Sequence, residues 1–145
     1  MRIAGLFVFH SPIRIPNSAL SWNVEDEMRS EDLKERTKKF ALEIIKLAER
    51  LPKNRITNVL STQLLRSATS VGANYRAACR ARSRADFIYK MGIVEEEADE
   101  TLYWLELLFD AKLAEQNKIQ DLMAEDSEIV AIVVASIKTA RRNKK

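Results

Sequence analysis

Residues 83–114 read SRADFIYKMGIVEEEADETLYWLELLFDAKLA, and this stretch decides the fold class. Ser83 and Asp86 stand three residues apart, a spacing that resembles the capping box at the start of a helix. Apolar or small residues then recur at alternating steps of four and three, as the buried face of a long helix requires. They are Phe87, Met91, Val94, Ala98, Thr101, Leu105 and Leu108. We therefore predict a helix over residues 84–114.

Three further stretches have the same period. The first covers residues 31–51, with Ser30 as its expected N-cap, and it ends before Pro52 because proline disfavours helical geometry in the preceding residue. The others cover residues 55–80 and 118–141. No proline follows Pro52. The sequence therefore predicts an all-α fold, an antiparallel up-down-up-down four-helix bundle with short loops.

The N-terminal segment differs from the rest of the chain. Residues 1–29 hold two of the three prolines and the only histidine, and they have no helical period. We predict an irregular or disordered leader there, followed by one domain over residues 30–145. The leader's apolar stretch is too short to span a membrane and lacks a clear cleavage site, so we expect a cytoplasmic protein without membrane contact.

Met28 is a candidate for the true start of the protein. The residues just before it, Val24 to Asp26, can be encoded by purine-rich codons that contain a ribosome-binding sequence. We expect translation to begin at Met28. Mass spectrometry of the native N-terminus tests this, because a peptide that contains Trp22 would refute it.

The scarcity of cysteine and histidine excludes several classes of site. Cys79 is the only cysteine and His10 the only histidine, so a cysteine-based zinc cluster and histidine-dependent catalysis in the bundle are excluded. Glu97 and Glu100 stand one turn apart, but a dinuclear site of the ferritin type would also need histidine. No phosphate-binding glycine loop or nucleophile motif occurs. We expect no metal, no cofactor and no enzymatic activity.

Charge is distributed unevenly along the chain, although the net charge is only +3. Residues 51–85 contain lysine and arginine but no aspartate or glutamate, and residues 86–110 are strongly acidic. The two regions are electrostatically complementary. This pattern allows two uses of the arginines, in phosphate contacts or in ion pairs with the acidic helix.

The first use suits arginines at the end of a helix and in a loop. Such residues can contact phosphates without reading sequence, and this is our expectation for the clustered group and for the basic C-terminal end. The alternative is that these residues pair with acids across the bundle or across a subunit interface. The expected nucleic-acid-binding residues are Arg76, Arg80, Arg82, Arg84, Arg141 and Arg142.

The second use suits Arg66, which lies in the middle of its helix. We expect it to join a structural network with Glu97 and Glu100, and we place Asn74 there as a buried hydrogen-bonding group that sets the register. Trp104 could stack on bases, but a tryptophan among leucines is more typical of a core or subunit interface. We expect that role for Trp104, Phe87 and Leu64.

Four separated blocks resemble the bacterial four helix bundle protein family. They begin at Ser30-Glu-Asp-Leu-Lys34, Gln63-Leu-Leu-Arg66, Ser83-x-x-Asp86-Phe87 and Glu96-Glu-Ala-Asp-Glu100. This family includes proteins encoded in intervening sequences of large-subunit ribosomal RNA genes, and it is similar to the accessory variability protein of diversity-generating retroelements. The resemblance implies a homo-oligomer, a ring-like pentamer in similar members, and a possible reverse transcriptase partner.

The residues and the resemblance together give two expectations for function. The first is a non-enzymatic, oligomeric protein that binds nucleic acid, preferably RNA, through the basic surface of the second helix and the loop that follows. The alternative is a protein-interaction scaffold or accessory subunit, for example of a reverse transcriptase, in which the arginines make subunit contacts. The two differ in whether the clustered arginines are exposed together or neutralised by acids.

Overall fold

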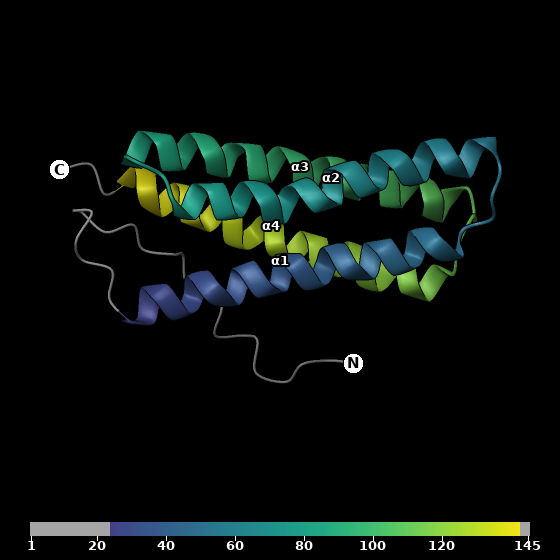
Figure 1. Cartoon of the computed structure of the whole chain (residues 1–145), viewed down its shortest axis with the longest axis horizontal. Coiled ribbons are helices and arrows are strands. Elements are labelled where there is room, and N and C mark those ends of the chain that lie inside the picture. The colour runs from purple at the N-terminus through teal and green to yellow at the C-terminus, as the bar shows by residue number, and fades with distance from the viewer. Residues whose placement is uncertain (1–23, 143–145) are drawn as a thin grey trace.

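The computed structural model describes residues 24–142 and the side chains of residues 29–142. It contains four helices: α1 (Val24–Arg50), α2 (Arg55–Cys79), α3 (Arg84–Asp110) and α4 (Gln116–Arg142). Each helix packs against its neighbour in sequence, and α1 packs against α4 to close the bundle. Successive helices run in opposite directions (Figure 1). The predicted all-α, up-down-up-down bundle is confirmed for the part of the chain that the structure describes.

The four apolar seams form one core. All seven residues of the seam predicted in α3 are buried. In α1 the buried residues of the predicted seam are Leu33, Thr37, Phe40, Ile44 and Leu47, at steps of four and three. Packing of these stripes against one another, rather than helix propensity alone, stabilises helices of this length.

The start of α1 corrects the prediction for residues 24–29. The helix already begins at Val24, so Ser30 lies inside it and is not an N-cap. Ser30 is buried, and its Oγ lies 3.3 Å from the Sγ of Cys79 on α2. The expected irregular leader otherwise concerns residues 1–23, which lie outside the described residues, and the start at Met28 stays a prediction.

Local residues explain the turn between α1 and α2. Asn54 is the N-cap of α2, and its Oδ1 accepts hydrogen bonds from the backbone N–H groups of Ile56 (3.0 Å) and Thr57 (3.1 Å). Thr57 Oγ1 in turn accepts from the Asn54 backbone N–H at 3.2 Å, which completes a capping box. Pro52 precedes this cap, so the chain stops one helix and starts the next within four residues.

The end of α3 differs from the prediction. The helix ends at Asp110 rather than at residue 114, and Lys112 has a φ of 54°. The N–H of Leu113 donates to the carbonyl of Leu108 and that of Lys112 to the carbonyl of Phe109, both at 3.1 Å. These two bonds define a Schellman motif with Lys112 at the left-handed position. Glycine usually signals this motif, and its absence explains why the sequence placed the end of the helix later.

Candidate nucleic-acid interface

Six arginines, four from the α2–α3 region and two from the end of α4, lie at one end of the bundle. The end of α2, the loop to α3 and the end of α4 all lie at the same end of the molecule (Figure 1). We name this surface the basic end. It consists of Arg76, Arg80, Arg82, Arg84, Arg141 and Arg142.

The loop between α2 and α3 is short and held by hydrogen bonds. The backbone N–H of Arg80, the C-cap of α2, donates to the carbonyl of Ala77 at 3.1 Å. Ser83 caps α3, and its Oγ accepts from the N–H of Asp86 at 3.1 Å. The Asp86 carboxylate accepts from Lys90 Nζ (2.9 Å) and from the backbone N–H of Arg82 (3.1 Å), and both contacts lower the pKa of Asp86. The loop therefore holds its backbone in a defined shape.

Five arginines of the basic end are exposed and make no salt bridge with another described residue. Among the residues whose side chains the structure describes, no carboxylate forms a salt bridge with any of the five. Arg84, the sixth, is only partly exposed. The five groups are positive charges available to a ligand: Arg76, Arg80, Arg82, Arg141 and Arg142.

Arginines along the sides of the bundle are paired instead. Arg36 on α1 donates to Glu125 (2.9 Å) and to Glu128 on α4. Arg66 on α2 donates to Glu97 (3.4 Å) and to Glu100 on α3, as the sequence suggested. The hydrogen bond from Arg66 lowers the pKa of Glu100. Two acids of α3, Glu97 and Glu100, are therefore paired with Arg66. They belong to the acidic region that was the alternative partner for the clustered arginines.

Asn74 does not join this network, which corrects its expected role. Its side chain is half-buried, and its Nδ2 donates to the carbonyl of Ser70 in the same helix at 2.8 Å. The buried residue at this level is Tyr75, because the seam of α2 steps by four from Val71 and then by three to Ala78. This choice buries the larger apolar group, a ring instead of an amide.

The three residues expected in a core or an interface lie as follows. Leu64 and Phe87 are buried. Trp104 is half-buried and packs against the core, while its Nε1 donates to Glu100 at 3.1 Å. Its ring meets that of Tyr103 edge to face, with centroids 5.0 Å apart. The indole is therefore held in place by contacts within the chain.

Two buried polar side chains were not predicted from the sequence. Asp126 on α4 is fully buried, and neither carboxylate oxygen has a hydrogen-bond partner among the described residues. Burial, with the nearby charges of Asp99 and Glu125, raises its pKa to about 8. Tyr75 is also fully buried, and its hydroxyl makes no hydrogen bond of normal length to any described residue; burial is the main cause that raises its pKa, with Cys79 as a smaller one. A signal for Asp126 did exist, because it lies between Leu122 and Ile129 on the seam of α4.

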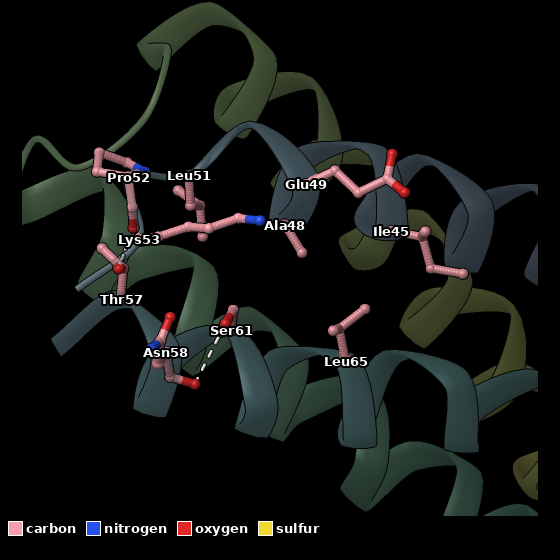
Figure 2. A pocket seen from close by; sticks show the side chains of 10 residues that line it. All are labelled: Ile45, Ala48, Glu49, Leu51, Pro52, Lys53, Thr57, Asn58, Ser61 and Leu65. Carbon is pink, nitrogen blue, oxygen red and sulfur yellow. Dashed lines mark hydrogen bonds between the residues drawn. The ribbon is translucent and has the colours of Figure 1, made fainter. Parts of the chain in front are cut away.

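A groove with both apolar and polar lining residues lies at the opposite end of the bundle from the six arginines. It has a volume of about 570 Å³ and lies between the end of α1, the turn and the start of α2. Figure 2 shows Ile45 and Ala48 of α1 facing Ser61 and Leu65 of α2, with Lys53 lying between the two helices. Other large apolar side chains of α1 and α2 are exposed as well, namely Leu42, Ile56 and Val59.

No group of three or more histidine, cysteine, aspartate or glutamate side chains could hold a metal ion along residues 24–142. None of the four helices is sufficiently long and apolar to cross a lipid bilayer.

Comparisons with known proteins agree with the fold and the sequence blocks. The chain is similar to a crystal structure from Bacteroides thetaiotaomicron, described as a protein with unknown function from the S23 ribosomal protein family. The two share 39% identity with a TM-score of 0.71, and the match covers 76% of this chain and 98% of the other. The comparison with curated proteins gave no match.

Residues 29–135 match a family model described as 23S rRNA-intervening sequence protein. This range includes α2, α3 and most of α1 and α4, so it contains all four sequence blocks. The resemblance inferred from those blocks to the intervening-sequence proteins is confirmed. The chain therefore belongs to the 23S rRNA-intervening sequence protein family.

Proposed function

We propose that this protein is a non-enzymatic nucleic-acid-binding protein that uses its basic end to bind phosphates, with RNA as the preferred class. The observation that carries the proposal is the contrast between two sets of arginines. Arg36 and Arg66 on the sides of the bundle are paired with carboxylates, whereas the five exposed arginines of the basic end are not. Among the described residues, five exposed arginines without a salt bridge lie at this end, against two, Arg50 and Arg55, at the other, and such a concentration of positive charge favours a polyanionic ligand.

The geometry of α2 suits a phosphate backbone. Arg76 and Arg80 stand one helical turn apart on the exposed face, about 5–6 Å between Cβ atoms. Arg82 extends the row into the loop, and the last turn of α4 adds two more charges. Arginine can donate two parallel hydrogen bonds to a phosphate. The preference for RNA is supported by the family, whose description refers to an intervening sequence of 23S rRNA.

The first experiment is fluorescence anisotropy of the full chain with labelled single-stranded RNA and with duplex DNA across a salt series. Phosphate binding by arginine releases counterions, so the affinity should fall steeply as salt rises. We expect tighter binding to RNA than to DNA. Absence of binding at low salt would refute the proposal.

Replacing arginines of the basic end by glutamate tests whether this end is the RNA-binding surface. Arg80→Glu combined with Arg82→Glu should weaken RNA binding and reduce the slope of log affinity against log salt by about one for each phosphate that is no longer bound. The matched control is Lys53→Glu with Arg55→Glu, because these exposed cations lie at the opposite end of the bundle (Figure 1). Circular dichroism and light scattering should show unchanged helicity and size. Equal weakening in both variants would contradict a site at the basic end.

The second candidate function, a protein-interaction scaffold, is favoured by the groove between α1 and α2. Apolar side chains that line it, such as Ile45 and Leu65, suit a protein contact better than a phosphate contact. We propose a second copy of the chain as the occupant, in keeping with the homo-oligomer, a pentamer, that the resemblance implies. A reverse transcriptase is the other proposed partner. If Ile45→Glu dissociates the assembly while the wild type binds no RNA, the scaffold is the better function.

A further inference from the structure

Tyr89 is the large apolar side chain with the greatest exposure among those described. It lies on α3 near the basic end, and 69% of its surface is exposed. A single exposed aromatic residue is common on protein surfaces and proves nothing by itself. Its position relative to α2 makes it informative.

The contacts between α2 and α3 fix the register of the two helices. Arg66 reaches Glu100 across the outer side of their seam, and the Oγ1 of Thr101 donates to the Oγ of Ser67 at 2.9 Å just beside it. Eleven residues make three turns of an α-helix and return a side chain to within about 20° of the same direction. The residue eleven positions after Arg66 is Ala77, and the residue eleven positions before Glu100 is Tyr89. Because the helices are antiparallel, these two residues lie beside each other, three turns closer to the basic end.

The neighbours of Tyr89 across the seam are therefore small or basic. Ala77 is a half-buried methyl group, and Ala73, one turn away on α2, is exposed, so neither covers the tyrosine ring. Arg80 lies three positions after Ala77 on the exposed face of the same helix, and Arg76, one turn before Arg80, lies about 100° around the helix from Ala77. A flat aromatic ring, a shallow alanine surface and two unpaired guanidinium groups thus occupy one side of the bundle.

We propose that Tyr89 is a stacking platform for an unpaired base of single-stranded RNA, whose phosphates are bound by Arg76 and Arg80. This proposal rests on the function proposed above and specifies its ligand. The face of a base is available for stacking only when the base is unpaired, so Tyr89 confers a preference for single strands over duplexes. Any base can stack on an aromatic ring, so the site would distinguish single strands from duplexes but would not distinguish one sequence from another.

Tyr103 provides a contrast on the same helix. It is also exposed, at 52%, but the exposed residues around it are acidic, including Asp99 and Glu106. Negative charge repels a phosphate backbone. Exposure of a tyrosine is therefore not sufficient in this molecule, and Tyr103 serves as the matched control for Tyr89.

The test compares three variants of the full chain on three RNA probes. The probes are a short single-stranded oligouridylate, the same strand paired as a duplex and a strand of equal length that lacks bases. Tyr89→Ala should weaken binding to the oligouridylate by roughly 5- to 100-fold, with little change for the duplex or the abasic strand. Tyr89→Phe should keep most of the affinity because it keeps the ring, and Tyr103→Ala should bind like the wild type.

The outcomes separate this proposal from the one on which it rests. If Tyr89→Ala binds the oligouridylate as the wild type does, while Arg80→Glu with Arg82→Glu still weakens it, the stacking site is refuted and phosphate binding stands. If the wild type binds none of the probes, both proposals are refuted. If Tyr89→Ala changes the size of the assembly without selectively weakening single-strand binding, Tyr89 is a protein contact and the stacking site is refuted.

Discussion

Asp126 is a carboxyl group in the core of the bundle without a hydrogen-bond partner among the described residues. A buried, unpartnered carboxylate is costly, so the group stays protonated and its pKa rises from 3.8 to about 8. Desolvation is the main cause, and the charges of Asp99 and Glu125 add to it. The partly buried salt bridge between Arg36 and Glu125, the residue before Asp126, leaves Asp126 itself without a partner among the described residues.

This shift gives the protein an unusual pH dependence of stability. Below about pH 3.8 the carboxyl is protonated in both states and the folded state has no disadvantage. Between 3.8 and about 8 the unfolded state ionises while the folded state does not, so the free energy of unfolding contributed by this group decreases as pH rises. Asp126→Asn should therefore stabilise the protein near pH 7, by on the order of 3 kcal/mol, and much less near pH 4.

Urea denaturation at both pH values measures this effect. Asp99→Asn is the control, because it removes one charge that raises the pKa of Asp126 without touching the buried group, and it should give a smaller gain of the same sign. A decrease in stability of Asp126→Asn at neutral pH would show that the ionised carboxylate has a partner in solution.

At the level of helices, the sequence predicted the apolar faces better than the ends. The steps of four and three in α1 and α3 correctly predicted which side chains are buried, because an amphipathic helix packs only one face against the core. Ends were predicted where a local residue marks the boundary, as Pro52 does after α1 and Ser83 does at the start of α3. The end of α3 was missed because Lys112 adopts the conformation that glycine normally provides, and only packing of Leu113 against the core selects it.

Lys112 consequently stores backbone strain that glycine would relieve. A left-handed conformation costs an L-amino acid roughly 1–2 kcal/mol, and glycine adopts it without this cost. We expect Lys112→Gly to raise the free energy of unfolding by about 1 kcal/mol in urea denaturation. Ala111→Gly is the matched control: Ala111 has an ordinary φ of −78°, so glycine there should give no gain. Equal effects at the two positions would exclude strain at Lys112.

The two glycines inside helices should respond differently to alanine. A Cβ on Gly92 of α3 would meet no atom within 4 Å, so Gly92→Ala should stabilise the helix by about 0.5–1 kcal/mol. A Cβ on Gly72 of α2 would lie 3.1 Å from Thr37 Oγ1. Thr37 is buried and its Oγ1 bonds the carbonyl of Leu33 at 2.9 Å, so it can yield little space. Gly72→Ala should therefore gain nothing or destabilise, and thermal denaturation of both variants compares them.

At the scale of the whole molecule, the bundle has two chemically different ends, and its sides are linked by ion pairs. The sequence indicated the arginine cluster, since Arg76 and Arg80 share a helix face, but it could not show which charges are paired. The pair between Arg36 and Glu125 joins α1 to α4 and depends on the register of helices that are distant in sequence. The groove beside Ile45 likewise exists only once α1 and α2 are packed.

This separation of the ends predicts that assembly and RNA binding can be uncoupled. If copies associate through the groove, Ile45→Glu should dissociate the assembly, as measured by light scattering, because it places a charge in an apolar contact. The basic end lies at the other end of the bundle, so affinity for a short RNA should remain.

Affinity for a long RNA should instead decrease by about 100-fold or more in this variant, because one strand can then no longer bind several basic ends at once. Ile45→Val keeps an apolar side chain in the groove and should behave as the wild type on both RNAs. Equal affinity of Ile45→Glu and the wild type for the long RNA, despite dissociation, would mean that each bundle binds alone. In that case the basic end of a single chain must supply the whole affinity, and the number of phosphate contacts deduced from the salt slope should match its exposed arginines.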